Sequence, residues 1–487
     1  MNKVLFSHSY FLSFDPKQLA AGKPYPPLAT IYAASFIREN GFEISLFDTM
    51  FAKSDKELQK YLEIHKPDYF VLYDDGFNYL TKMCLTNMRE AAFNMIKFAK
   101  NYGCTVIVSS SDSTDHYQEF LSEGADFIII GEAEITLLEL ITTLKNKKTD
   151  YSEIKGLAFK KDGTFCKTST RPVIKDIDML PMPAWDLINV EQYKNIWQKN
   201  AGYFSLNIST TRGCPFKCNW CAKPIYGNRY NARSPQLVID ELKWLKTRYG
   251  FDHIWFCDDI FGLKPGWLLE FSELVQKEKL FFSFKIQSRA DLLLNEEDVK
   301  ALSIAGCVDV WIGAESGSQK ILDAMDKGTT IQQIEKATKL LKGNNINPCF
   351  FIQFGYLGET FEDIEQTLKM INKFKPHEIG ISVSYPLPGT LFYEKVKADL
   401  KGKTNWKDSD EMAMMFTNTY SPIFYKYLHQ FVHTNYHKEI ALENLKNLTT
   451  HPTKSNLKKI KKALSAAYYI PAVFWGIKKL KKLQYHN

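Results

Sequence analysis

The chain has 487 residues, 45% hydrophobic and 24% charged, so it is long enough for two or three domains and has the composition of a globular protein, not of a disordered or multi-span membrane protein. The net charge of +7 comes from one end, because residues 454–487 hold nine lysines and no acidic residue and leave the rest of the chain at −2, which argues against nucleic acid as a partner. The first residues lack the apolar core of a signal peptide and the nine cysteines are mostly isolated, so we expect a cytoplasmic protein without disulfides.

Residues 1–145 alternate short apolar runs with segments of helical period. Strands are expected at KVLFSH, FEISLFD, DYFVLY, TVIVSS and DFIII, and a helix is expected at LATIYAASFIREN, which Gly41 closes. Alternating strands and helices predict a parallel sheet covered by helices on both faces. A ligand of such a sheet binds at the carboxyl ends of its strands, where Asp74, Ser110, Gly131 and Glu132 lie.

Residues 146–200 resemble a connector with a hairpin around Asp162 and Gly163. A second alternating series fills residues 201–400, with strands expected at YFSLNIST, HIWFCDD, FFSFKIQS, VDVWIGAES, CFFIQFGYLG and EIGISVSYPLPG. Six such units predict a (β/α)6 partial TIM barrel whose site lies at the carboxyl ends of the strands. Residues 401–487 are expected to form a helical extension.

Three cysteines stand close together in TTRGCPFKCNWCAKP, at positions 214, 218 and 221. Soft thiolates of this kind bind zinc or an iron–sulfur cluster. A structural zinc site usually has four ligands, and no histidine lies within thirty residues of Cys221. We therefore predict that Cys214, Cys218 and Cys221 bind a [4Fe-4S] cluster and leave one iron open to another ligand.

The C-x3-C-x2-C spacing after the first barrel strand, with Trp220 before the last cysteine, resembles the signature of the radical S-adenosylmethionine (SAM) superfamily. The motifs FCDDIF, QSRADLL, AGCVDVWIGAESGSQKILDAMDKGTT, GYLGET and YPLPGT follow in the order of its cobalamin-binding class. YPPLATIYAASFIRENGFEISLFD and GADFIIIGEAEITLLELI are similar to the opening and closing segments of that class's N-terminal domain. The resemblance extends to the group of the anaerobic Mg-protoporphyrin monomethyl ester cyclase and covers roughly residues 1–400.

This resemblance implies an oxygen-sensitive enzyme with a Rossmann-like cobalamin-binding domain, a radical SAM core and an electron donor such as flavodoxin or ferredoxin. In such enzymes one electron from the cluster cleaves SAM and releases a 5′-deoxyadenosyl radical. The positions that it implies for SAM are Trp220, Asp258, Asp259, Arg289, Glu315, Ser316 and Gly355, and those for cobalamin are Asp74, Ser110, Gly131 and Glu132. Asp258 and Asp259 have the alternative of capping the next helix. No catalytic residue is assigned.

The reaction implied is methylation or oxidative cyclisation of an unactivated carbon in a hydrophobic or lipid-like substrate, and the motifs do not choose between the two. The chain lacks the Asp-x-His-x-x-Gly motif of corrinoid domains that bind cobalt through histidine. The cobalamin is therefore bound without a protein histidine, or the N-terminal domain is empty, and His8, His65 and His116 are expected at the surface or in turns. A non-catalytic iron–sulfur redox sensor or carrier is the alternative outside enzymes.

The C-terminal tail joins an apolar run, residues 463–477, to flanking lysines and the aromatic residues Tyr468, Tyr469 and Trp475. The run contains Pro471 and is shorter than the roughly 20 residues that cross a bilayer. Two interpretations stay open. The tail is either an interfacial segment on the inner face of the membrane or a helix that packs on the barrel with a solvated basic end.

Overall fold

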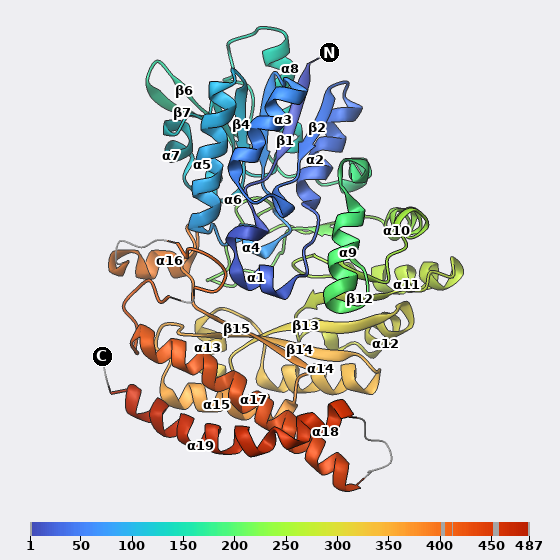
Figure 1. Cartoon of the computed structure of the whole chain (residues 1–487), viewed down its shortest axis with the longest axis vertical. Helices are drawn as coiled ribbons and strands as arrows, with labels where there is room; N and C mark the ends of the chain where they lie inside the picture. The colour runs from blue at the N-terminus through green and yellow to red at the C-terminus, as the bar shows by residue number, and fades with distance from the viewer. Residues whose placement is uncertain (1, 401–404, 412, 451–456, 486–487) are drawn as a thin grey trace.

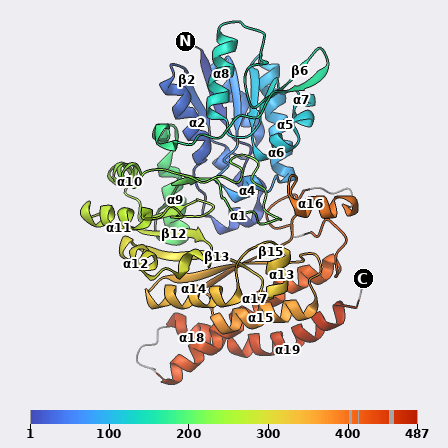
Figure 2. The same cartoon turned by 180° about the vertical axis from the view of Figure 1, so that it is seen from behind.

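Two sheets and a C-terminal group of helices follow one another along the computed structural model, which describes residues 2–400, 405–411, 413–450 and 457–485. Figures 1 and 2 show the first sheet at one end of the molecule, the second sheet across the middle and three C-terminal helices at the opposite end.

The first sheet contains five parallel strands in the order β2-β1-β3-β4-β5. Their bounds are β1 (Lys3–Ser7), β2 (Glu43–Phe47), β3 (Tyr69–Tyr73), β4 (Thr105–Ser109) and β5 (Phe127–Ile129). Successive side chains of β1 enter opposite layers: Val4 and Phe6 join the core under α2 (Leu28–Glu39) and α8 (Glu134–Lys145), and Leu5 joins the core under α3 (Leu58–His65) and α5 (Thr86–Asn101). Strand order reverses between β1 and β3, the point at which such sheets bind ligands.

A hairpin of β6 (Leu157–Lys161) and β7 (Thr164–Lys167) extends this sheet, because β6 pairs antiparallel with β5. Asp162 and Gly163 both have positive φ, +48° and +80°, as a two-residue turn between strands requires. The turn was predicted. The pairing of the hairpin with the first sheet was not predicted, because residues 146–200 were interpreted as a connector. An antiparallel edge strand has no crossover helix, so nothing in the sequence indicates which strand it pairs with.

The second sheet has six strands, all parallel, in the order β15-β14-β13-β12-β11-β8. They are β8 (Ser205–Ile208), β11 (His253–Phe256), β12 (Ser283–Ser288), β13 (Cys307–Glu315), β14 (Asn347–Phe354) and β15 (Glu378–Val383). The long helices between them are α10 (Pro235–Tyr249), α11 (Trp267–Lys277), α12 (Glu296–Ala305), α14 (Ile331–Gly343) and α15 (Phe361–Phe374). The expected α/β fold with parallel sheets is confirmed.

The remaining helices and strands before residue 400 connect these elements. They are α1 (Pro16–Ala21), α4 (Tyr79–Lys82), α6 (Ser111–Asp115), α7 (Tyr117–Ser122), α9 (Val190–Ala201), β9 (Thr211–Arg212), β10 (Asn231–Ala232), α13 (Gln319–Ala324) and α16 (Leu391–Val396). Helix α9 ties the two halves together, because the Trp197 indole donates to the Pro24 carbonyl at 2.7 Å and the Tyr193 hydroxyl donates to Asp48 at 2.6 Å. Pro26 in turn accepts from Asn207 of β8 at 3.0 Å.

The chain ends in α17 (Pro422–Thr450), α18 (Leu457–Leu464) and α19 (Ala466–Leu483). Helix α19 packs on α17, where a Cβ added to Gly476 would lie 2.8 Å from the Phe431 ring and where Leu480 is fully buried. Among the described residues, no helix is both long enough and apolar enough to cross a bilayer. Lys454, the first lysine of the basic tail, lies outside the described residues.

Candidate active site

The loop that carries the three cysteines leaves β9 and returns through β10, which pairs antiparallel with it. Gly213 begins the loop with φ of +81°, and a side chain there would overlap the Arg229 carbonyl oxygen. Only glycine fits this conformation and this close approach. The short ladder and Gly213 therefore fix the direction in which the cysteine loop enters the carboxyl end of the second sheet.

The three thiols lie close enough to influence one another. Burial raises the pKa of Cys214 and raises the pKa of Cys221 to about 11, each raised further by another cysteine of the loop and lowered by Lys223. Among the described residues, no three Cys, His, Asp or Glu side chains converge on one metal ion. Three thiols on one loop are a donor set that fits an iron–sulfur cluster, in which each thiolate binds a different iron.

Asn219 joins the loop to segments that follow β13 and β14 of the second sheet, and it was missed in the sequence analysis. Its side-chain amide donates to the Ala324 carbonyl and to Asp326, both at 2.8 Å, and its oxygen accepts from the Tyr356 hydroxyl at 2.7 Å. Asn219 is 4% exposed. It stands between two cysteines in the motif, but its partners lie more than a hundred residues along the chain, so spacing gave no signal of its role.

Arg289, on the β12 side of the loop, contacts it directly. The guanidinium donates to Sγ of Cys218 at 3.8 Å and stacks 3.7 Å from the centre of the Phe216 ring. It also donates to the Lys327 carbonyl at 2.8 Å. Nitrogen donors of this kind hydrogen-bond to cluster thiolates and tune their potential.

Glu315, at the end of β13, forms a buried ion pair with Lys327 at 2.8 Å and has a positive φ of +55°. Lys327 lies in the quoted motif DAMDKGTT but was not assigned a role. Trp220 has an open group, because its indole N–H is buried without a hydrogen-bond partner among the described residues. A buried donor without a partner is a place for a ligand.

The two aspartates after β11 have different surroundings. Asp258 accepts from the Thr210 and Thr211 backbone, at 2.7 and 2.8 Å, and from the Thr210 hydroxyl at 2.6 Å. Burial raises its pKa to about 6. Asp259 forms an ion pair at 2.7 Å with Lys82 of α4, so this ion pair joins the two halves of the chain. The next helix, α11, begins at Trp267, so neither aspartate caps it.

Ser316 and Gly355 are held by protein groups. The Ser316 hydroxyl lies 3.2 Å from that of Thr367 and accepts from the Ser318 N–H at 3.1 Å. Gly355, after β14, has φ of +76° and donates its N–H to Glu359 at 2.7 Å, and its carbonyl accepts from Asn418 at 2.6 Å. Asn418 belongs to the C-terminal extension, which therefore covers this end of β14.

The four residues predicted at the first sheet lie at the carboxyl ends of β3, β4 and β5. Asp74 accepts from the Ser9 N–H at 2.7 Å and from its hydroxyl at 3.0 Å, and burial raises the pKa of Asp74 to about 6. Ser110 caps α6. Gly131 has φ of +82° and approaches the Ile225 carbonyl of the cysteine-loop segment. This edge therefore faces the second half of the chain.

Glu132 is engaged by Arg212, the residue before Gly213. The guanidinium donates to Glu132 at 2.5 Å and to Glu134 at 2.7 Å, and all three side chains are almost fully buried. The rings of Tyr32, Phe77 and Tyr226 surround the Arg212 guanidinium, whose carbon lies 5.3 to 5.9 Å from the ring centres. The carboxylate that we predicted for cobalamin thus joins the first sheet to the cysteine loop, and Arg212 was not predicted.

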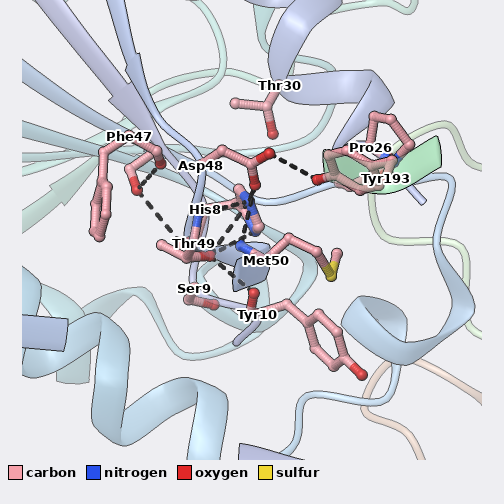
Figure 3. A network of polar contacts seen from close by, with 12 residues as sticks. His8, Ser9, Tyr10, Pro26, Thr30, Phe47, Asp48, Thr49, Met50 and Tyr193 are labelled. Carbon is pink, nitrogen blue, oxygen red and sulfur yellow. Dashed lines mark hydrogen bonds and ion pairs between the residues drawn. The ribbon is translucent and has the colours of Figure 1, made fainter. Parts of the chain in front are cut away.

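His8 was expected at the surface or in a turn, and this expectation was wrong. Figure 3 shows it buried between Asp48 and Thr49. Its ring nitrogens lie 2.9 Å from Asp48 and 3.0 Å from the Thr49 hydroxyl, and Tyr193 holds the other Asp48 oxygen. Both ring nitrogens are engaged by the protein, so His8 has none free for a metal.

Comparisons with known proteins agree with the motifs. Residues 208–371 match the Radical SAM superfamily. An uncharacterized methyltransferase of Pyrococcus horikoshii is 29% identical over 79% of this chain and 82% of its own. The anaerobic magnesium-protoporphyrin IX monomethyl ester cyclase of Rubrivivax gelatinosus is 28% identical over 80% of this chain and 70% of its own. The resemblance inferred from the motifs is confirmed.

A solved structure shows the same fold at low identity. The radical S-adenosylmethionine methyltransferase TsrM from Kitasatospora setae, solved with cobalamin and a [4Fe-4S] cluster bound, superposes with a TM-score of 0.68 at 17% identity. The superposition covers 81% of this chain and 78% of that one.

Proposed function

We propose that this chain, whose residues 208–371 form a radical SAM domain, binds a [4Fe-4S] cluster, SAM and cobalamin and methylates or oxidatively cyclises an unactivated carbon of a hydrophobic substrate. The chain is an enzyme of the radical SAM methyltransferase and cyclase class. The observation that carries the proposal is the cysteine loop, with its three thiols gathered at the carboxyl end of a parallel sheet.

Cys214, Cys218 and Cys221 are the ligands that we propose for the cluster. When bound, the cluster would supply one electron and an open iron for the cleavage of SAM. The chain itself provides the surroundings: Arg289 donates to Cys218, and Asn219 keeps the loop against α13 and β14. Positioning of this kind, and exclusion of water, are the protein's share of radical chemistry.

SAM would lie beside the same loop, where Trp220 and the Glu315–Lys327 pair stand. The Trp220 indole N–H is a buried donor without a partner among the described residues. Glu315 and Lys327 offer an acceptor and a cation, which match a ribose hydroxyl and a carboxylate. Ser316 supports this region through its hydroxyl, and Gly355 supports it through its backbone N–H and carbonyl.

Cobalamin would lie at the carboxyl edge of the first sheet, between the two halves of the chain. Asp74, Ser110 and Gly131 mark this edge. It faces the cysteine-loop segment, because a Cβ added to Gly131 would lie 3.6 Å from the Ile225 carbonyl oxygen. Because both nitrogens of His8 are engaged, we propose that the corrinoid binds without His8 on the metal. The binding of cobalamin by TsrM supports this proposal at the level of the fold.

The alternatives make different predictions for bound groups. A radical SAM enzyme with an empty first sheet would keep the cluster and retain no corrinoid after hydroxocobalamin is added and removed by gel filtration. A redox sensor or carrier would hold the cluster without binding SAM. The buried Glu315–Lys327 pair favours the enzyme, because a sensor has no need of a second polar site beside its cluster.

The test of the proposed cluster is iron content after anaerobic reconstitution. We expect about four irons per chain in the wild type. The variant C214A/C218A/C221A should lose them, and the matched variant C257A/C307A/C349A, which removes three buried cysteines of the barrel strands and their ends, should keep them. Retention of iron by the first variant would place the metal elsewhere.

A further inference from the structure

The last two helices carry a continuous apolar stripe on their outer side. It consists of Leu457, Ile460, Leu464, Tyr468, Pro471, Phe474 and Trp475, which we call the α18–α19 stripe. From Leu457 to Phe474 the successive members are three or four residues apart, and Trp475 follows Phe474 directly, so these side chains lie on one side of the two helices across the junction of α18 and α19. Leu457 is 78% exposed, Leu464 and Tyr468 are each 69% exposed, and Trp475 is 66% exposed.

The opposite face of the same helices is buried. Ala463, Ala466 and Leu480 are at most 5% exposed, and Gly476 is buried against Phe431 of α17. This buried face, packed on α17, is the apolar face that an amphipathic helix needs to cover. The exposed stripe is a second apolar face, and solvent-facing apolar patches of this kind mark binding surfaces.

Lysines flank the stripe. Lys461 and Lys462 lie between Ile460 and Leu464 in α18, and Lys478, Lys479, Lys481 and Lys482 end α19, all of them exposed. The Lys478 ammonium lies 4.1 Å from the centre of the Phe474 ring, and Lys481 lies 3.7 Å from Glu365. Apart from Glu365, no described acidic residue forms an ion pair with these six lysines. The border is strongly cationic.

An apolar stripe with tyrosine and tryptophan, flanked by lysines, matches the surface of an anionic bilayer. Tyrosine and tryptophan prefer the headgroup level, and lysines attract anionic headgroups while their carbon stems follow the apolar side chains. A second copy of the chain fits less well, because a stripe facing its own copy would bring the two lysine borders together without acidic partners.

We propose that the α18–α19 stripe docks the protein on the surface of an anionic phospholipid membrane, with Leu464, Tyr468 and Trp475 entering the interface. Both helices lie parallel to that surface, since no helix of the described residues spans a bilayer. Figures 1 and 2 show these helices at the end of the molecule opposite the first sheet, so docking leaves the edge between the sheets free.

The test is flotation of the full-length chain with phosphatidylcholine vesicles and with vesicles that also contain phosphatidylglycerol. We expect the wild type to float with the anionic vesicles and to stay in the bottom fraction of the gradient when the vesicles are neutral. The double variant L464E/W475E and the double variant K478E/K482E should each lower the fraction floated at least about tenfold, the first through lost apolar burial and the second through lost charge attraction.

Matched controls lie far from the stripe. I64E/F281E replaces two exposed apolar residues, 62% and 82% exposed, and K56E/K60E reverses two exposed lysines beside the first sheet. Both controls should float like the wild type, and circular dichroism should show all five proteins equally folded. The proposal is overturned if the wild type does not float, if the controls lose flotation as the stripe variants do, or if L464E/W475E keeps it. It is also overturned if light scattering shows that the wild type is a dimer, that L464E/W475E is a monomer, and that none of the five proteins binds lipid.

Discussion

Glu359 illustrates how strongly single side chains in this molecule are perturbed by burial. Its carboxyl group is fully buried behind Gly355, with one oxygen accepting from the Gly355 N–H and the other without a partner among the described residues. Burial raises the pKa of Glu359 to about 8. The folded chain therefore holds a proton that the unfolded chain releases near pH 4.

The stability of the wild type should fall as pH rises from about 4 to 8, because a raised carboxyl pKa stabilises only the protonated folded state. The shift to about 8 corresponds to roughly 5 kcal/mol of the free energy of unfolding. Glu359→Gln stays neutral at every pH. We expect the thermal midpoints of the two proteins to be similar at pH 5 and the variant to be more stable at pH 9; an equal difference at both values would contradict the assignment.

The residues that could be predicted from the sequence are those whose chemistry shows in local spacing. Cys214, Cys218 and Cys221 identify themselves by their separation in the chain. Arg212, Asn219 and Lys327 do not, because each derives its role from partners that only the folded sheet brings near. The burial of His8 was missed for the same reason, since Asp48 and Tyr193 come from β2's end and α9.

At the scale of elements, Arg212 decides how the cysteine loop meets the first sheet. It lies in β9 and reaches Glu132 and Glu134, which precede and begin α8. Removing a partner from a buried ion pair typically costs about 3–5 kcal/mol, because it leaves uncompensated charge, and a folded protein is stable by only about 5–15 kcal/mol. The junction is therefore sensitive to one side chain.

Arg212→Met should lower the free energy of unfolding by about 3–5 kcal/mol, measured in urea. The triple variant R212M/E132Q/E134Q removes the stranded charges and should recover much of that loss. Arg38→Met breaks an ion pair with Asp186 in which the two side chains are 40% and 60% exposed, so it should cost less than about 1 kcal/mol. Equal losses in R38M and R212M would show that the buried cluster has no special role.

Asn219 gives an element-scale prediction for the cysteine loop. Asn219→Ala removes the hydrogen bonds that join the loop to α13 and to Tyr356. We expect the reconstituted variant to release iron to a chelator several-fold faster than the wild type. Its thermal midpoint should change little more than that of the control Asn344→Ala, because among the described residues the Asn344 side chain hydrogen-bonds only to the Leu340 carbonyl at the end of its own helix. Unchanged iron release would contradict the role given to Asn219.

The strands and long helices could be predicted from periodicity, and the structure has them in the expected order. The attachment of β6 and β7 to the first sheet could not, because the pairing of an edge strand depends on which edge is free after folding. The tail was left with two interpretations. The structure packs one face of α19 on α17, a helix of the extension itself, and exposes the α18–α19 stripe on the other face, and contact with a membrane stays a proposal.

Considered as a whole, the molecule brings its two halves together beside the cysteine loop. Lys82, from the first half, pairs with Asp259 of the second. Both charges act on the thiol of Cys221, and Asp259 also acts on that of Cys214. A nearby positive charge favours the reduced, more negative state of a cluster, and a negative charge disfavours it. The junction of the halves can therefore set the cluster's reduction potential.

Lys82→Met should lower the midpoint potential of the reconstituted cluster, and Asp259→Asn should raise it, by tens of millivolts in opposite directions. A redox titration followed by electron paramagnetic resonance measures both. Lys82→Arg keeps the charge and should stay near the wild type. Shifts of the same sign in K82M and D259N would show that the variants act by disturbing the loop instead of by charge.

The most direct measurement is the formation of 5′-deoxyadenosine from SAM by the anaerobically reconstituted, chemically reduced chain. The wild type should produce it many-fold faster than C214A/C218A/C221A, and the control C257A/C307A/C349A should match the wild type. Formation at the same rate in the wild type and the first variant, or none in the wild type with its cluster fully reduced and SAM in excess, would contradict the account.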